Sequence, residues 1–279
     1  MGRRRQAVSY KRVAADHASG RGTWNGDTYV SGLRTQEVPS RGLSYRVSQH
    51  LLEGGIHNLL SGKEWSCFLD VEFRVLGLRR LDALARGWVF DQYAFPLDES
   101  LEVAREIGVR HPAFAGVLQQ IRTDVVGYAP VDGNLLWMPF TCKVNAGLYR
   151  RAIEKLEIER RLWRRRGAEL ELYTESDIAE GRLRSLELFR PFFNLQNVLS
   201  PPPDARAALE VAWREVLRRR PGYALSVASA ELDRYFGIPS GGAQTLLLHL
   251  LAHRVIEVDF SRPFDLRRPV SALTWIGGK

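Results

Sequence analysis

Three polar residues that lie far apart in the sequence could together carry out metal-assisted hydrolysis. Asp124 begins an apolar segment, Lys143 ends the next one, and Glu64 precedes a segment whose apolar residues recur at helical spacing. Carboxylate oxygens are the ligands that Mg²⁺ prefers. A lysine beside them can orient an attacking water or stabilise the charge that develops on phosphorus. These residue types favour phosphodiester hydrolysis if the fold brings them together.

A predicted β-hairpin would place Asp124 close to Lys143. The segment TDVVGYAPVDGNLLWMPFTCKV (residues 123–144) reads as two strands around a turn at Asp132-Gly133. Glu64 would come from a helix predicted at about residues 61–73, with Ser61 as its N-cap. Taken alone, an Asp followed by an x-x-Lys on the next strand is weak evidence for a nuclease, because the pattern occurs by chance in many proteins.

The other predicted elements indicate a mixed α/β domain followed by a helical one. In the first part, the patterns predict a strand at 88–95, a helix at 99–109, a helix at 148–167 and a strand at 169–174. This order indicates a small mixed sheet with helices.

The C-terminal part begins its helices after a proline-rich break at residues 200–204. The patterns there predict a helix at 204–222, two helices on either side of a turn at 237–242, a strand from Val255 and a second strand within 271–277. This order favours a winged-helix-like domain. We therefore expect two domains, residues 1–178 and 179–279.

The composition is that of a globular protein with an excess of arginine. The chain has 279 residues, of which 45% are hydrophobic and 26% charged, which excludes a disordered or collagen-like protein. The 40 Lys and Arg residues outnumber the 32 Asp and Glu residues, which gives a net charge of +8. This charge favours a polyanionic partner such as DNA, although an arginine-rich genome would also explain it.

Cysteine content and hydropathy predict where the protein resides. Cys67 and Cys142 lie far apart, which argues against a zinc site and against a disulfide-rich secreted scaffold. No apolar stretch is long enough for a signal peptide or a membrane span. We therefore expect a cytoplasmic protein that does not interact with a membrane. Residues 1–45 are basic and rich in Gly and Ser, so an extended arm with little core of its own is expected.

Several segments, in the same order and at similar spacing, resemble the TnsA endonucleases. They are EVPSRGLSYRV (37–47), HNLLSGKEWSCFLDVEF (57–73), FDQYAFPL (90–97), VRHPAFAGVLQQIRTDVV (109–126), FTCKVN (140–145) and EKLEIERRLW (154–163). TnsA is the restriction-endonuclease-like subunit of heteromeric cut-and-paste transposases. The resemblance covers about residues 35–178 well and the C-terminal part loosely.

The resemblance implies a fold, a site and partners. The implied fold is a mixed-sheet, restriction-endonuclease-like α/β core with a C-terminal helical, winged-helix-like domain. The implied catalytic residues are Glu64, Asp124 and Lys143. Glu64, Asp124 and the backbone carbonyl of Cys142 would hold Mg²⁺, and Mn²⁺ would substitute for it.

The family resemblance also implies the reaction and the partners. The chain would cut double-stranded DNA at the 5′ ends of a transposon, while a TnsB-like transposase processes the 3′ ends. A TnsC-like ATPase would be a further partner. Thr141 stands where the family carries Gln, and Thr123 replaces the proline of the wider nuclease motif, so Glu64 must supply the second carboxylate.

Charged residues near the predicted site have more than one interpretation. Seven arginines crowd the helix after Lys143, and four of them are candidate DNA-phosphate contacts: Arg150, Arg151, Arg160 and Arg164. The alternative is a solvated basic face.

Other candidate residues on and near this helix have mainly structural explanations. We expect Glu157 to pair with Arg161 along the helix. Glu159 could assist metal binding, position Lys143 or form a similar pair. His57 and His111 are expected to be structural, because Mg²⁺ prefers oxygen ligands.

Two further functions remain open from the sequence. The chain could be a stand-alone restriction or structure-specific nuclease that uses the same residues. Alternatively, it could be a winged-helix DNA-binding adaptor with an inactive nuclease-like domain. Thr141, a poorer metal ligand than a carboxylate, favours the inactive alternative.

Overall fold

A computed structural model describes most of the chain between residues 56 and 277. The described residues are 15, 18–22, 29–35, 43–48, 56–81, 87–114, 116–131, 133–143, 149–174, 176–198 and 200–277, without the side chains of 79–81 and 114. Arg3 to Arg5, most of the predicted N-terminal arm and Asp132 of the predicted turn lie outside these residues. The chain divides into two compact units, Met1–Asp177 and Ile178–Lys279, next to the predicted boundary at residue 178.

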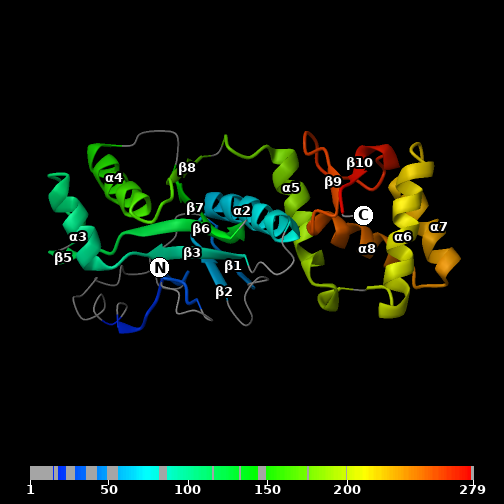
Figure 1. Cartoon of the computed structure of the whole chain (residues 1–279), viewed down its shortest axis with the longest axis horizontal. Helices are drawn as coiled ribbons and strands as arrows, with labels where there is room; N and C mark the ends of the chain where they lie inside the picture. The colour runs from blue at the N-terminus through cyan, green and yellow to red at the C-terminus, as the bar shows by residue number, and fades with distance from the viewer. Residues whose placement is uncertain are drawn as a thin grey trace, which may run out of the picture. The chain divides into compact units, whose positions relative to one another are not determined.

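A mixed four-stranded sheet forms the centre of the first unit (Figure 1). Its strand order is β3-β6-β7-β8, and only the β7–β8 pair is parallel. The bounds are Trp88–Ala94 for β3, Arg122–Val131 for β6, Asn134–Cys142 for β7 and Glu171–Tyr173 for β8. The mixed α/β class expected from the sequence is therefore confirmed.

The predicted hairpin is the β6–β7 pair. Its last pair joins Val131 to Asn134, and Gly133 in the turn has a φ of +74°, a conformation that glycine adopts without strain. Two short antiparallel pairs accompany the sheet: β1 (Tyr45–Ser48) with β2 (Ile56–Leu59), and β4 (Ala113–Phe114) with β5 (Val117–Leu118).

Helices cover both faces of the sheet. Helix α2 (Gly62–Leu81) packs on β6 at Gly127, where a Cβ atom would lie only 2.7 Å from the Val71 side chain. The neighbouring strand residue Val126 points to the other face, because successive strand residues alternate. There it joins a core with Trp163 of α4.

The helices of that second face are α3 (Leu97–Glu106) and α4 (Arg150–Arg164). Helix α2 continues beyond the predicted end at residue 73, because Val75 and Leu76 are also buried and extend its apolar face.

Tyr29, in the segment expected to form an extended arm with little core of its own, belongs to the hydrophobic core around β3. Tyr29 is only 3% exposed, and its ring centroid lies 4.8 Å from that of Phe90. Its hydroxyl donates to the backbone carbonyl of Asp91, and Gly22 accepts a hydrogen bond from the Ala94 backbone N–H. Gly22 and Tyr29 therefore pack on β3, since an aromatic ring with a satisfied hydroxyl gains stability by burial.

The second unit contains four helices and a two-stranded sheet among its described residues. Helices α5 (Glu180–Phe189), α6 (Pro203–Arg219), α7 (Leu225–Phe236) and α8 (Gly242–Ala252) precede the antiparallel pair of β9 (Ile256–Val258) and β10 (Leu273–Trp275). Three 3-10 helices, η1 (Arg190–Phe193), η2 (Leu195–Asn197) and η3 (Val270–Ala272), connect them. Helix α5, η1 and η2 were not expected from the sequence.

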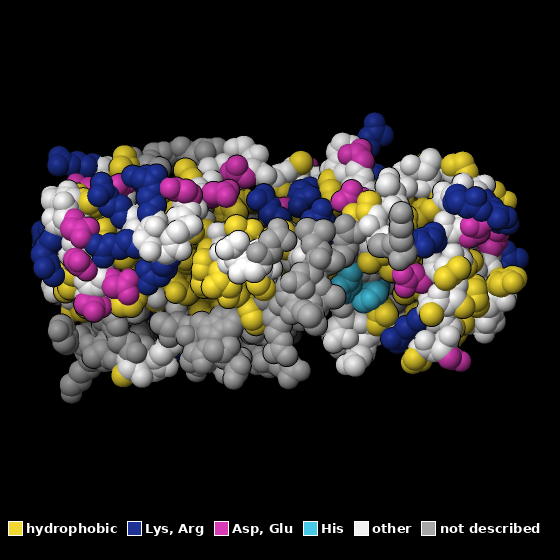
Figure 2. Space-filling model, viewed as in Figure 1, with side chains coloured by type: hydrophobic (Ala, Val, Ile, Leu, Met, Phe, Trp, Pro, Cys, Tyr) yellow, Lys and Arg dark blue, Asp and Glu magenta, His cyan; other side chains and the backbone are white. Residues whose placement is uncertain are grey.

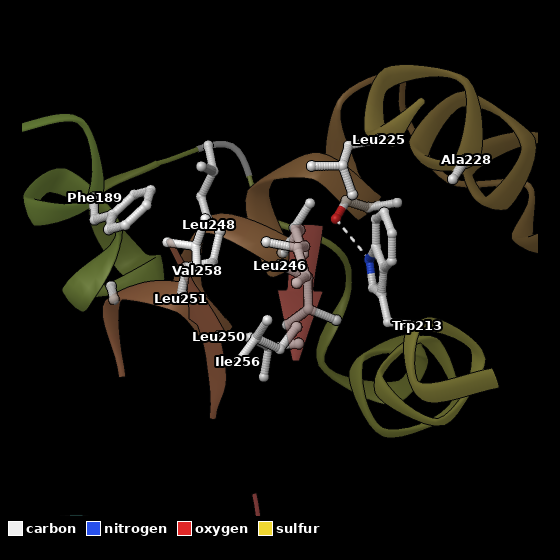
Figure 3. Close-up of a cluster of buried hydrophobic side chains, with 14 of the residues drawn as sticks. Phe189, Trp213, Leu225, Ala228, Leu246, Leu248, Leu250, Leu251, Ile256 and Val258 are labelled. Atoms are coloured by element: carbon white, nitrogen blue, oxygen red, sulfur yellow. Dashed lines mark hydrogen bonds between the residues drawn. The ribbon is translucent and has the colours of Figure 1, made fainter. Parts of the chain in front are cut away.

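A separate hydrophobic core holds the second unit together (Figure 3). Trp213 of α6 is fully buried, and its Nε1 donates to the Ala243 carbonyl of α8 at 3.0 Å. Nine of the 11 residues of α8 are buried, so this helix is a core element of the unit. None of the helices described in either unit combines the length and the apolar content that crossing a membrane requires.

Candidate active site

The structure brings Glu64, Asp124 and Lys143 together. Lys143 Nζ lies 3.4 Å from Asp124 Oδ2. The amide of Gln92 joins the two carboxylates: its Nε2 donates to Glu64 Oε2 at 3.1 Å and to Asp124 Oδ1 at 3.4 Å. The three predicted residues therefore meet around one point, with Gln92 as a fourth member of the group.

The end of β7 surrounds one oxygen of Asp124 with donors. Oδ2 accepts the Cys142 backbone N–H at 2.7 Å and the Thr141 hydroxyl at 3.3 Å, in addition to the Lys143 ammonium. The Cys142 carbonyl accepts from Lys143 Nζ at 3.1 Å, which places it in the same group of atoms. These donors hold the Asp124 carboxylate in one orientation, with its other oxygen turned to Gln92.

Glu64 is anchored by the beginning of α2. Its backbone N–H donates to the Ser61 hydroxyl at 3.2 Å, and its Oε2 accepts the Leu60 backbone N–H at 2.9 Å. The Ser61 hydroxyl accepts the N–H of the third helical residue, which confirms Ser61 as the N-cap, and the Glu64 carboxylate accepts the N–H of the residue before the cap. Burial raises the pKa of Glu64 to about 8, and the charge of Asp124 adds to the effect. A buried and a partly buried carboxylate near one point favour a bound proton or cation.

Lys143 carries a positive charge at this point. Burial lowers the pKa of its ammonium group, but the charges of Asp124 and Glu159 outweigh that effect, and the net pKa lies above the ordinary value. Lys143 is therefore suited to donate hydrogen bonds and stabilise negative charge, and poorly suited to accept a proton. Lys63 adds a second ammonium group nearby, 3.5 Å from the Lys143 carbonyl oxygen.

Glu159 supports β6 next to the site. It is buried, and its Oε1 accepts the Thr123 hydroxyl at 2.8 Å, while Thr123 accepts Trp163 Nε1 at 2.8 Å. Burial raises the pKa of Glu159 to about 7, although the charge of Lys155 opposes this shift. Thr123 replaces the motif's proline and directly precedes Asp124. Its hydroxyl thus links this part of β6 to α4.

The residues expected to be structural have structural contacts. His57 Nδ1 lies 2.8 Å from a buried oxygen of Asp91, and His111 Nε2 lies 2.9 Å from the Ser100 hydroxyl. Glu157 pairs with Arg161 at 2.8 Å, as predicted for residues one helical turn apart.

The candidate DNA-binding arginines all have carboxylate partners. The pairs are Arg150–Glu154 at 3.2 Å, Arg151–Glu154 at 2.8 Å, Arg160–Glu157 at 2.8 Å and Arg164–Glu169 at 2.8 Å. Figure 2 shows the same mixing of dark blue and magenta side chains over the region that Figure 1 labels α3 and α4. Their contact with DNA stays a prediction.

Gln92 is the site residue that sequence reasoning missed. It lies in β3, which the sequence did predict, and it is only 3% exposed. The available signal was a polar residue within an otherwise apolar strand, in the segment WVFDQYAF. That signal does not tell which face the side chain occupies.

The donor atoms suit a small, hard cation. No group of three or more His, Cys, Asp or Glu side chains arranged to hold a metal ion occurs among the described residues. Two carboxylates from Glu64 and Asp124 and the Cys142 carbonyl do converge. Mg²⁺ binds oxygen ligands of this kind, often one or two carboxylates, and keeps several waters. The residues present therefore fit such an ion.

Comparison with known proteins gives one informative similarity. No family model matches the chain. Over 181 residues it is 31% identical to the transposon Tn7 transposition protein TnsA of Escherichia coli. The match covers 64% of this chain and 62% of that relative, less than two thirds of its length. The resemblance inferred from the sequence is thereby confirmed: over 64% of its length the chain is similar to a TnsA transposition protein.

Proposed function

We propose that this protein is a metal-dependent DNA endonuclease subunit of a transposase. The observation that carries the proposal is the convergence of Glu64, Asp124 and Lys143 in a chain related to a transposition protein. A mixed sheet with α2 and α4 on opposite faces, and with the acid and the lysine on neighbouring strands, supports a restriction-endonuclease-like core.

The site residues would divide the chemistry among them. Glu64, Asp124 and the Cys142 carbonyl would hold Mg²⁺ or Mn²⁺, which when bound lowers the pKa of water and neutralises charge on the phosphate. Lys143 would donate a hydrogen bond to the scissile phosphate or to the attacking water. Hydrolysis in this way yields a 3′-hydroxyl and a 5′-phosphate.

Transposition supplies the proposed substrate and partners. The chain would cut the 5′ ends of a transposon, while a TnsB-like transposase cuts and joins the 3′ ends and a TnsC-like ATPase takes part in the assembly. The second unit supports a docking or DNA-binding role, because three helices followed by a two-stranded sheet resemble a winged-helix domain. Because most of α8 is buried, a surface of the second unit other than this helix would contact the DNA or the partner protein.

The arginines of α4 would contact the DNA backbone. Arg150 is 94% exposed and Arg164 is 49% exposed, so phosphates can compete for them with their carboxylate partners. Such contacts position DNA without selecting its sequence.

The test is cleavage of DNA carrying the transposon ends by the full chain together with its TnsB-like partner and Mg²⁺. Asp124→Asn keeps the size of the side chain and removes its charge, and Lys143→Met removes the ammonium group. Each change should lower the rate of 5′-strand cleavage by at least about 100-fold. Asp98→Asn, at an exposed position of α3, is the matched control and should leave the rate unchanged.

The same assay separates the other functions. Cleavage that survives both Asp124→Asn and Lys143→Met would contradict the catalytic assignment and favour an inactive DNA-binding adaptor. Mg²⁺-dependent cutting of plasmid DNA by the chain alone, without a preference for transposon ends, would instead favour a stand-alone nuclease.

A further inference from the structure

Gln92 lies between the two carboxylates that would hold the cation. Its single amide nitrogen donates to Glu64 Oε2 at 3.1 Å and to Asp124 Oδ1 at 3.4 Å. Each of these carboxylates is fixed independently, Glu64 by the cap of α2 and Asp124 by the end of β7. Among the described contacts, Gln92 is the side chain that joins these two anchored groups, and it comes from a third element, β3.

The backbone of Gln92 is in an unusual conformation for a strand residue. Its φ is +53°, in the left-handed region that residues other than glycine rarely adopt. The effect is visible in its neighbours. Phe90 and Tyr93 both lie against Trp137, with ring centroids 6.5 and 6.2 Å away. In a regular strand, residues three apart would point to opposite faces. The irregularity at Gln92 therefore turns its side chain away from that aromatic cluster and towards Glu64.

The surrounding structure is built to hold this conformation. A Cβ atom on Gly32 would overlap the Gln92 carbonyl oxygen, and one on Gly22 would lie 3.0 Å from it. Asp91, the preceding residue, is fixed by His57 and by the Asn58 backbone N–H at 2.9 Å. A left-handed conformation costs about 1–3 kcal/mol, so it persists only where neighbours enforce it, and such positions cluster at functional sites.

We propose that Gln92 is a positioning residue that holds the carboxylates of Glu64 and Asp124 at the separation a divalent cation requires. This inference rests on the proposed function. The carboxylates of buried Glu64 and partly buried Asp124 repel each other, and an amide donor that is shared between them offsets the repulsion without adding a charge of its own. Because of its left-handed backbone, Gln92 places its amide donor on the side of the sheet where α2 begins.

The experiment measures cation binding and does not depend on cleavage. Mn²⁺ is titrated into the full chain without DNA, and its affinity is measured by calorimetry. Two variants remove the amide in different ways. Gln92→Met keeps the length of the side chain, and Gln92→Gly also relieves the left-handed backbone. Groups that orient metal ligands commonly change the affinity about 10- to 100-fold when they are removed, and a loss of that size is expected for both variants.

Stability separates positioning from a purely structural role. Both variants lose the amide, but Gln92→Gly also removes the backbone strain, because glycine accepts a φ of +53°. It should therefore lower the melting temperature of the cation-free protein no more than Gln92→Met does. Arg254, with a φ of +55° in the second unit, provides the matched control. Arg254→Gly relieves the same kind of strain and should leave Mn²⁺ affinity unchanged.

The outcomes distinguish a failure of the positioning role of Gln92 from a failure of the proposed metal-dependent function. If Asp124→Asn abolishes Mn²⁺ binding but both Gln92 variants bind Mn²⁺ as the unmodified chain does, Gln92 is not a positioning residue and the proposed function stands. If the unmodified chain binds no Mn²⁺, or if Asp124→Asn binds it equally well, the metal site itself is wrong and the inference falls with it.

Discussion

Glu64 belongs both to the cap of α2 and to the candidate metal site, and substitution can separate these roles. Its Oε2 accepts the Leu60 backbone N–H as well as the Gln92 amide. A glutamine at this position can still accept from Leu60, because its amide oxygen is a hydrogen-bond acceptor. It cannot supply a negative charge to a cation.

We therefore predict that Glu64→Gln keeps the melting temperature of the protein but lowers Mn²⁺ affinity by at least about tenfold. Glu64→Ala should lose both properties, because removing the acceptor of the Leu60 N–H costs about 1 kcal/mol. Thermal unfolding and Mn²⁺ titration of the two variants test this. Equal Mn²⁺ affinity in Glu64→Gln and the unmodified chain would show that Glu64 is only a capping residue.

Glu159 should make stability depend on pH. In the unfolded chain its carboxyl ionises near the ordinary pKa of 4.5, whereas the folded protein keeps it protonated up to about pH 7. The folded state then holds a proton that the unfolded state has released. The contribution of Glu159 to the free energy of unfolding is therefore largest below pH 4.5. It decreases as the pH rises to about 7, by a total on the order of 3 kcal/mol.

Glu159→Gln should remove this dependence. The free energy of unfolding of the variant, minus that of the unmodified chain, should increase as the pH rises from 5 to 8. Urea unfolding at several pH values measures this difference. Glu157→Gln is the control, because Glu157 is paired with Arg160 and Arg161 at the surface of the same helix. A difference between Glu159→Gln and the unmodified chain that stays constant with pH would contradict the prediction.

At the scale of elements, the contact between α2 and β6 decides where Glu64 lies relative to Asp124. Gly127 allows this contact, since a Cβ atom there would lie 2.7 Å from Val71 and 2.9 Å from Met138. Val71 is fully buried and β-branched, so it cannot move aside easily. The close approach of α2 to β6 therefore depends on the absence of a side chain at Gly127.

Gly127→Ala should destabilise the protein by about 1–3 kcal/mol and also weaken Mn²⁺ binding, because it displaces the helix that carries Glu64. Chemical unfolding and Mn²⁺ titration measure the two effects. Gly222→Ala is the matched control, since a Cβ atom there would meet nothing within 4 Å. If Gly127→Ala has the stability of the control, the close packing of α2 on β6 is not what positions the site.

At the scale of the whole molecule, each of the two units has its own hydrophobic core. The proposed chemistry belongs entirely to the first unit, because Glu64, Gln92, Asp124 and Lys143 all precede residue 178. A change in the core of the second unit should therefore leave cation binding intact.

Trp213→Phe tests this independence. The change removes the hydrogen bond to the Ala243 carbonyl and leaves space in the core, at a cost of about 1–3 kcal/mol to the second unit. We expect a lower melting temperature for that unit in calorimetry and unchanged Mn²⁺ affinity at 25 °C. A parallel loss of Mn²⁺ affinity would show that the two units are coupled.

The sequence by itself determined those features that depend on local patterns. Alternating β-forming residues around Gly133 identified the hairpin, and Ser61 marked the beginning of α2. The order of the segments around Glu64, Asp124 and Lys143 identified the TnsA relationship. These signals lie within short stretches of chain, where residue type and spacing are sufficient to predict structure.

Only the tertiary structure decided how the site is assembled. Tyr29 lies in a segment without an apolar pattern, yet it is buried against β3. Gln92 lies in a predicted strand, but its left-handed backbone places its side chain where simple alternation would not. In both cases the deciding contacts join residues remote in the sequence, such as Gly32 with Gln92 and Gln92 with Asp124. Packing between distant segments can enforce a conformation that local propensity disfavours, and no pattern within either segment records it.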